Sequence, residues 1–463
     1  MSTEEESIIE CESARAGHAS RRRDRQAAKS IAAGLAGQVL SYGARLAVVP
    51  LSLTLVGVEG YGLWLVVGSL VAWSGLTDFG FSPGLINVIA QAYGRSDREG
   101  IRRHISTGFA INGILALVLA LVFVMVADWS GLPRLLGIKD PKLIAEVHYV
   151  VLASGLLTAG MTLTRVIPTV CTALQEGYLV TWSTLGGSLV ALLLLLLLAL
   201  KGTSLLGYTL AMGLPPLTAQ LVLGGHLFFR SHPDLRPKLR NCERSSFIAI
   251  LRFAGPLTLY QIAIMGTLQS ANIMIANRLG PAIVPQYSVP YAAFAVLISI
   301  TWGIAFPFLP AYSEAAARDD WHWIRRRATM VWASTAAIVG GGGILFVLTG
   351  SRLVDIWTGG RIVPTTGLLA ALGCYCVLRS LSNATGVLLS GLGRVGLLGV
   401  VACMSTMLYV AGAWKLLAIV GLFGIPLAGV VAHLLEGALV LPYALRQLGC
   451  FGELVWRKRA AQQ

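Results

Sequence analysis

The chain has 463 residues, of which 55% are hydrophobic and 13% charged, and its formal net charge is +14. A soluble domain carries about 25% charged residues, so this composition excludes an ordinary soluble protein. Apolar runs of about 18 residues or more recur along the chain, which predicts several membrane-spanning helices. The positive charge follows the loops between these runs, as in membrane proteins generally, so no nucleic-acid partner is expected.

Residues 1–30 are polar, acidic at first and then basic, and are expected to form a disordered cytosolic tail without a cleavable signal. Charged or Gly- and Pro-rich loops divide the rest into twelve predicted spans. These spans cover residues 31–56, 61–93, 104–128, 146–173, 178–200, 204–229, 249–278, 284–315, 327–350, 364–391, 395–418 and 421–446. The expected fold class is an all-α membrane protein.

The basic residues predict the orientation of these spans. Of the 36 Lys and Arg residues, 25 fall on the side of both termini, eight on the opposite side and three inside spans. Because cytoplasmic loops carry the excess of Lys and Arg, both termini are predicted to be cytosolic. An even number of spans agrees with this placement.

A weak internal repeat appears at an offset of 223 residues. Residues 80–103 and 303–326 share seven of 24 positions without gaps, and Gly57 matches Gly280. Both stretches end the second helix of a six-helix half, which predicts two parallel repeats with a site between them. The expected parts are an N-lobe (31–230), a basic cytosolic linker (231–248), a C-lobe (249–446) and a cytosolic C-terminal tail (447–463).

Ionisable residues inside the predicted spans are the main candidates for a site, because each costs about 2.5–3.5 kcal/mol unless it faces a cavity or a partner. Four of them stand out: Arg45, Asp78, Arg165 and Arg379. Three arginines against one aspartate favour an anionic substrate, and the planar guanidinium suits a phosphate group. Arg165 also continues a stripe of threonines, whose hydroxyls are equally typical of helix packing. Weaker cavity candidates are Gln269 and Asn272 in the predicted span 249–278 and Asn383 in the span of Arg379.

Asp78 lies in the stretch AWSGLTDFGFSPGLIN, residues 72–87, and allows two interpretations. It is either the ion-pair partner of Arg45 or Arg165, or a titrating group that couples transport to H⁺ or Na⁺. The small residues and the proline after it predict a bend, which Pro307 and Pro310 repeat in the second half. The chain has no phosphate-binding loop, metal-ligand cluster or nucleophile motif. We therefore expect no enzyme activity, no cofactor and no metal.

Four stretches resemble a known family. They are VGVEGYGLW (56–64), DFGFSPGLINVIAQ (78–91), ANRLGPAIVPQYSVPY (276–291) and PFLPAYSEAAARDD (307–320). From about residue 30 to 446 the chain is similar to the multidrug/oligosaccharidyl-lipid/polysaccharide (MOP) flippase superfamily, in its bacterial polysaccharide-transporter (Wzx-like) branch. The resemblance implies a V-shaped pair of six-helix lobes around a central cavity. It also implies a basic residue in the cavity on the first helix, a place that Arg45 occupies here.

The implied function is a flippase of the bacterial inner membrane. Its substrate would be a polyprenyl-pyrophosphate-linked oligosaccharide, an O-antigen or exopolysaccharide repeat unit moved from the inner to the outer leaflet. The implied partners are this lipid-linked substrate, membrane lipids, a polysaccharide polymerase and glycosyltransferases.

Other functions compete with this one. The first is a cation-coupled drug or metabolite exporter of the same superfamily. The second is a membrane enzyme such as a polysaccharide polymerase or a lipid-linked glycosyltransferase, although the longest predicted outer loop, 129–145, is short for a catalytic loop. A third is a scaffold without transport, which the arginines inside the spans argue against.

Overall fold

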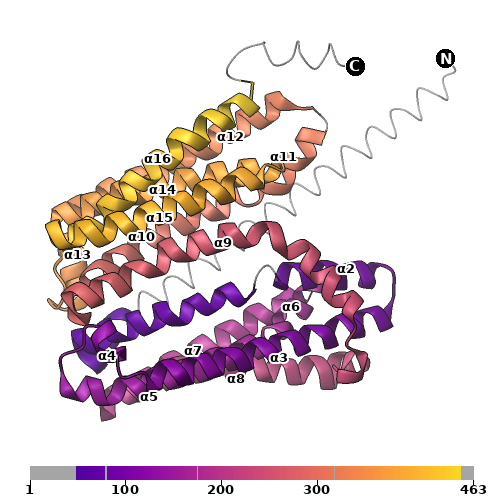
Figure 1. Ribbon diagram of the computed structural model, residues 1–463, viewed down its shortest axis with the longest axis horizontal. Helices are drawn as coiled ribbons and strands as arrows, with labels where there is room; N and C mark the ends of the chain where they lie inside the picture. Colours follow the sequence, from indigo (N-terminus) through magenta and orange to yellow (C-terminus); the bar gives the residue numbers. More distant parts are fainter. Residues whose placement is uncertain (1–47, 79–80, 175, 318, 450–463) are drawn as a thin grey trace.

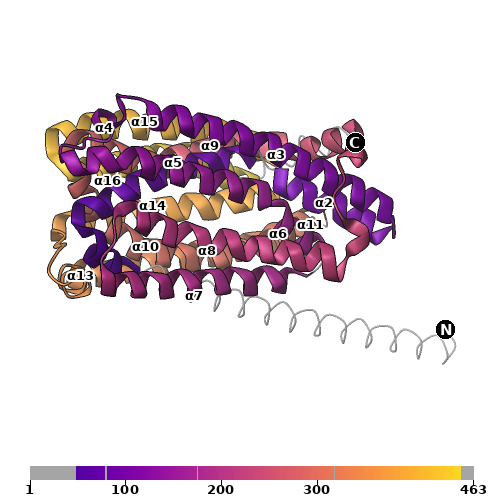
Figure 2. The ribbon, with the colours of Figure 1, turned by 90° about the horizontal axis from the view of Figure 1, so that it is seen from below.

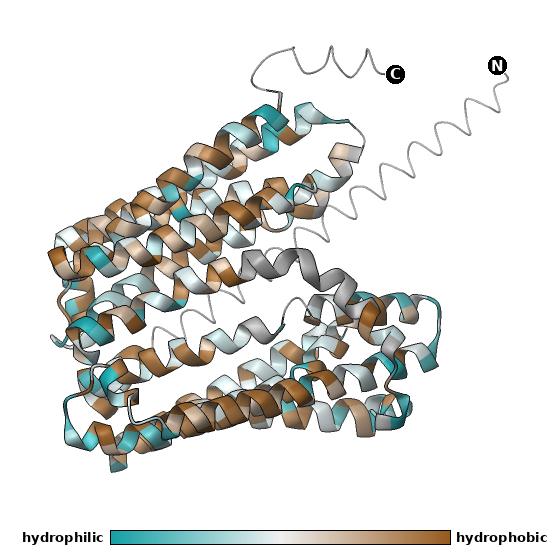
Figure 3. Ribbon diagram, viewed as in Figure 1, coloured by the Kyte–Doolittle hydropathy of each residue, from teal (hydrophilic) through white to brown (hydrophobic). Residues whose placement is uncertain are grey.

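The computed structural model describes residues 48–78, 81–174, 176–317 and 319–449. Arg45, the predicted N-terminal tail and residues 450–463 lie outside them. Every regular element of the described residues is helical, which confirms the predicted fold class. Within this part of the chain, nine helical stretches are long and apolar enough to cross a membrane. Polar residues gather at both ends of the helices, and apolar residues lie between (Figure 3).

Two of the nine stretches, Val48–Gly75 and Gly396–Gln447, each contain parts of two predicted spans. The backbone leaves the right-handed helical region inside each of them, at Gly57 (φ +71°) and at Gly421 (φ +64°). Together with α9 (Arg244–Leu279), the nine stretches therefore account for the twelve predicted spans.

The helices form two bundles joined by α9 (Figures 1 and 2). The first bundle contains the stretch Val48–Gly75 and α2 (Phe81–Gly94), α3 (Arg98–Asp128), α4 (Leu132–Leu135), α5 (Pro141–Thr164), α6 (Val166–Ala173), α7 (Gly177–Lys201) and α8 (Leu205–His226). The second contains α10 (Val284–Ala305), α11 (Phe308–Ala317), α12 (Trp321–Thr335), α13 (Gly342–Thr358), α14 (Thr366–Gly391), α15 (Val395–Val420) and α16 (Gly424–Gln447). Helix α9 packs on α15 of the second bundle and on α2 of the first.

Several helices depart from their predicted spans. The predicted span 61–93 is interrupted, because the 3₁₀ segment Trp73–Asp78 separates the first stretch from α2. The predicted span 284–315 breaks at the turn before α11, close to the bend expected at Pro307. The predicted span 327–350 was too short at both ends, since the helix runs from Trp321 to Thr358 through a π-helical segment, Ala336–Gly341.

The bundles are packed together at one end, which we call the tight end and define by the turns at Gly57, Gly137, Gly202, Gly280, Gly359 and Gly421. At this end an apolar cluster joins the bundles, with Leu53 and Tyr61 from the first and Val289 and Val354 from the second. The side-chain amide of Asn277 also donates to the Leu135 carbonyl at 3.0 Å. Toward the other end, the linker end, the bundles diverge and α9 crosses between them (Figure 1).

The predicted repeat is visible in the backbone. Among the described residues other than glycine, only Ser96 and Asp319 have positive φ, and both have a φ of +57°. The next residues, Asp97 and Asp320, cap the helices that follow, each by accepting from the N–H three residues ahead. These pairs stand 223 residues apart, the offset found in the sequence. The two halves therefore make the same turn by the same local chemistry.

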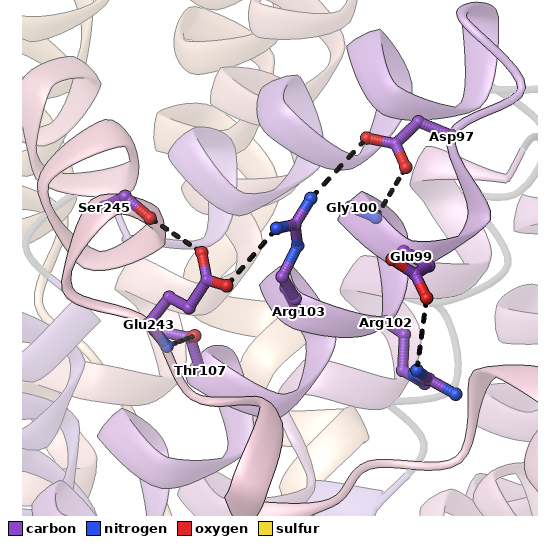
Figure 4. Close-up of polar contacts among 8 residues, drawn as sticks. All are labelled: Asp97, Glu99, Gly100, Arg102, Arg103, Thr107, Glu243 and Ser245. Carbon is purple, nitrogen blue, oxygen red and sulfur yellow. Dashed lines mark hydrogen bonds and ion pairs between the residues drawn. The ribbon is translucent and has the colours of Figure 1, made fainter.

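The connector between the bundles is tied to α3 at the linker end. Arg103 lies between Asp97 at 4.0 Å and Glu243 at 3.3 Å (Figure 4). The Glu243 N–H donates to the Thr107 hydroxyl, and Arg98 pairs with Asp234. A hydrogen bond from Arg98 lowers the pKa of Asp234, and the Ser245 hydroxyl, with Arg103 second, lowers that of Glu243. The start of α9 is thus held by the first bundle.

Candidate functional site

Asp78 lies at the end of the 3₁₀ segment Trp73–Asp78, where the second helix is interrupted. Its Oδ1 accepts from the Ser82 hydroxyl at 2.6 Å and from the Ser82 N–H at 3.2 Å. The Arg165 Nη1 lies 3.6 Å from the same oxygen, and both side chains are less than a third exposed. Of the two partners expected for Asp78, the structure places Arg165 beside it.

Arg165 sits at a break between α5 and α6. Pro168 accounts for the break, because a proline cannot donate to the carbonyl four residues back and its ring presses on that carbonyl. The hydroxyls of Thr158 and Thr169 donate to carbonyls of their own helix, at 2.6 and 2.8 Å. These two threonines therefore satisfy carbonyls of their own helix, and Arg165 lies at the break beside Asp78.

Arg379 lies on α14 in the second bundle and is surrounded by aromatic rings. Its guanidinium donates to the Tyr291 hydroxyl and lies 6.0 Å from the centre of that ring. Tyr291 stacks on Tyr287 at 5.8 Å and on Tyr375 at 6.5 Å. No described carboxylate lies within ion-pair distance of Arg379. The two arginines thus differ, since Arg165 has a carboxylate partner and Arg379 has a phenol.

Two cavities adjoin this cluster, and Thr267 and Leu268 of α9 line both. The larger, of about 180 Å³, is also lined by Gln269, Asn272, Tyr287, Ser288, Tyr291 and Tyr375. The smaller, of about 50 Å³, is also lined by Arg379, Asn383, Ser382, Ser405, Thr406, His433 and Glu436, with Ala263, Ile264 and Ala402. Four predicted site residues therefore line neighbouring cavities, while Asp78 and Arg165 line neither.

Asn272 also links the two bundles. Its side-chain N–H donates to the Ser69 hydroxyl at 2.9 Å, across the interface with the first bundle. Its amide oxygen accepts from the Ser288 hydroxyl of α10 at 2.7 Å. Both ends of the amide are therefore engaged, and this contact must break if the bundles separate here.

His433 and Glu436 of α16 are absent from the residues predicted above. The His433 Nδ1 lies 2.9 Å from the Glu436 Oε2, and the two side chains are 12% and 14% exposed. The signal was present in the sequence, as two ionisable residues one helical turn apart inside an apolar run. The predicted site contained only arginines and an aspartate as ionisable residues and did not include this pair.

Residues 27–315 match the family of polysaccharide biosynthesis proteins, which is 289 of the 463 residues. The chain belongs to this family. A protein of Salmonella typhimurium (strain LT2) named "Putative O-antigen transporter" is 20% identical over 294 residues, which cover 61% of this chain. The match spans 64% of that relative's length. These findings confirm the resemblance to the polysaccharide-transporter branch of the MOP superfamily.

Solved structures of multidrug transporters share the fold of this polysaccharide biosynthesis family member. An inward-facing MATE family transporter of the MOP superfamily gives a TM-score of 0.77 at 15% identity, covering 88% of this chain and 95% of that one. An outward-facing structure gives 0.57 at 16% identity, covering 91% and 93%. At this identity the likeness establishes the fold alone. Family, fold and the nine apolar helical stretches of the described residues together indicate a multi-pass membrane protein.

Proposed function

We propose that the chain is a flippase that moves a polyprenyl-pyrophosphate-linked oligosaccharide, an O-antigen or exopolysaccharide repeat unit, across a bacterial inner membrane. The observation that carries the proposal is Arg379. It lines a cavity between α9 and the second bundle, and no described carboxylate lies within ion-pair distance of it, since Glu436 of the same wall is paired with His433. A cation at membrane depth is costly unless something compensates it, and a diphosphate would do so. Its planar donor fork matches phosphate oxygens.

The larger cavity suits the sugar part of such a substrate. Gln269, Ser288 and Thr267 bring amide and hydroxyl groups to its wall, beside the ring of Tyr291. These groups can exchange hydrogen bonds with sugar hydroxyls, and the adjoining smaller cavity brings Arg379 next to them. The polyprenyl tail would remain in lipid, outside the bundles.

The Asp78–Arg165 pair has a different role in this proposal. Asp78 already accepts from Ser82 and faces Arg165, so the pair is neutral as a unit. This geometry favours Asp78 as an ion-pair partner over Asp78 as the coupling group. The pair would hold the broken second helix against the α5–α6 break while the bundles move.

The proposal places the linker end in the cytosol. Arg98, Arg102 and Arg103 lie at this end with the basic connector, as the excess of cytosolic Lys and Arg requires. The lobes would be residues 31–230 and 249–446, with the connector 231–248 between them and both tails cytosolic. The membrane potential, negative inside, favours outward movement of an anion by about 2.3 kcal/mol per charge per 100 mV. A polymerase and glycosyltransferases would act after and before the flippase.

Genetic complementation tests the proposal. A strain whose own O-antigen or exopolysaccharide flippase is deleted should regain surface polysaccharide with the wild-type gene. It should regain little with Arg379→Ala, and an intermediate amount with Arg379→Lys, which keeps the charge but loses the fork. The control is Arg352→Ala, an exposed arginine at the tight end that should behave as wild type. Full function of Arg379→Ala at equal expression would overturn the proposal, and drug resistance without surface polysaccharide would indicate an exporter.

A further inference from the structure

A His–Glu pair lies inside the last helix of the second bundle. Helix α16 runs from Gly424 to Gln447 within a stretch apolar enough to cross a membrane. His433 and Glu436 stand one turn apart on it and share a hydrogen bond of 2.9 Å. Ionisable residues at membrane depth are rare and are usually functional, because each is expensive to hold there. The pair therefore requires a reason beyond packing.

The surroundings of the pair identify what it can bind. His433 and Glu436 line the smaller cavity together with Arg379. A metal cation would meet the positive Arg379 there, and the described residues contain no group of three metal-ligating side chains. A proton is the cation that remains, because an imidazole accepts one near neutral pH and a neighbouring carboxylate stabilises the product.

Other titratable groups stand on the helices packed against α16 around the pair. They are Arg379, Tyr375 and Cys376 on α14, and Cys403 and Tyr409 on α15. The ring of Tyr375 lies 5.7 Å from that of His433. Of the described side chains of α9, Ala263, Ile264, Thr267 and Leu268 line the cavity, and none of them is titratable. Within the described wall, Glu436 is thus the one carboxylate and His433 the one imidazole.

We propose that His433 and Glu436 form a proton-binding site that sets the charge of the cavity shared with Arg379. Without the added proton, a neutral imidazole and a carboxylate give the pair one negative charge. This charge cancels the positive charge of Arg379. A proton taken from water adds to the imidazole, and the imidazolium donates to Glu436. The pair is then neutral, and the cavity carries one positive charge from Arg379.

The protonated cavity is the better site for an anion, since the negative charge that competes for Arg379 has been neutralised. Proton occupancy would therefore control how strongly the cavity holds a phosphate group. This consequence rests on the proposed function, but the proton site itself does not, because its protonation can be measured without any substrate.

Nuclear magnetic resonance of the full-length protein in detergent, with isotope-labelled histidine, tests the site directly. The signal lost in His433→Gln identifies His433 among the seven histidines. Tyr375→Leu gives a second assignment, because it removes the ring beside His433 alone. We expect this signal to change with pH in the wild type as the imidazole takes up a proton. We expect its midpoint to change by about one pH unit in Glu436→Gln and in Arg379→Gln, as each substitution removes a neighbouring charge.

The chain offers a matched control in a second His–Glu pair. His232 and Glu176 lie 3.1 Å apart at the linker end, with side chains 26% and 25% exposed. The His232 signal should respond to Glu176→Gln and ignore Arg379→Gln. A His433 signal that does not change with pH, or whose midpoint is the same in the wild type, Glu436→Gln and Arg379→Gln, would overturn the proposal. If the protein does not transport polysaccharide but the His433 signal changes with pH as expected, the proposed function is wrong and the proposed proton site is supported.

Discussion

The contact between the bundles at the tight end depends on Gly62, and replacing it with alanine should force the bundles apart there. A Cβ at Gly62 would lie 2.8 Å from the carbonyl carbon of Pro281, closer still to the carbonyl oxygen, and 3.1 Å from the Pro285 Cδ. Carbon atoms pack best at about 3.5–4.0 Å, so the Pro281 backbone would have to retreat by roughly 0.7 Å or more. Backbone cannot rotate out of the way as a side chain can.

The size of the effect follows from the cost of overpacking, which is about 1–3 kcal/mol for one inserted carbon in a well-packed site. The clash exists only while the tight end is closed. It therefore raises the free energy of the closed state and leaves unchanged that of a state in which the bundles have separated. A penalty of this size shifts a two-state equilibrium by about 5- to 150-fold. Gly62→Ala should therefore populate molecules that are open at the tight end.

Distance measurements between spin labels can detect this shift. In a cysteine-free background, labels at Lys201 and Thr366 would report on the tight end, since both residues are exposed and belong to different bundles. The control is Gly68→Ala on the same helix, because a Cβ at Gly68 meets nothing within 4 Å. We expect a longer distance population in Gly62→Ala alone. Identical distributions in both variants, with Gly62→Ala well folded, would refute the reasoning.

Three further predictions follow from other contacts. Asp78→Asn should lower the melting temperature more than the double variant Asp78→Asn/Arg165→Gln, because the single change leaves a charge unpaired; additive effects would contradict the ion pair. Asn272→Ala should weaken the contact between the bundles by about 1 kcal/mol, because it removes the hydrogen bond to Ser69, and should lengthen the same label distances. Unchanged distances would contradict a role for this hydrogen bond in holding the bundles together. The pKa of Asp234 is lowered in the folded protein, so its contact with Arg98 stabilises the connector fully well above pH 4. This stabilisation is lost as the pH falls below about 4. Hydrogen exchange of the connector should rise there, and Asp234→Asn should reduce the change to the part that comes from Glu243.

Much of the fold is predictable from the sequence because it depends on local signals. Apolar runs of spanning length predict the helices, and the glycines at positive φ mark where the chain must turn back. The repeat was visible as a weak match at one offset, and Ser96 and Asp319 now show that the match preserves a backbone turn. The extension of α12 to Trp321 was not predicted because the basic run Arg325–Arg327 resembles a loop when it lies at the end of a span.

The site was harder to predict, since it depends on which helices meet. The sequence marks Arg165 and Arg379 as equivalent deep cations. Only the packing distinguishes them, by placing Asp78 beside the first and Tyr291 beside the second. The helix break at Trp73–Asp78 lies directly before the small residues and Pro83 that predict a bend, and the segment also contacts α9.

Transport of a lipid-linked oligosaccharide by the purified protein tests the central claim most directly. Full-length protein would be placed in liposomes that contain a polyprenyl-pyrophosphate-linked oligosaccharide on one leaflet, and its arrival on the other would be followed with a glycosidase added there. We expect translocation that depends on the protein and falls by about tenfold or more in Arg379→Gln, as for a lost hydrogen bond to a charged group, while Arg352→Gln retains the wild-type rate. No translocation by correctly folded wild-type protein, or an equal rate in Arg379→Gln, would contradict the central claim.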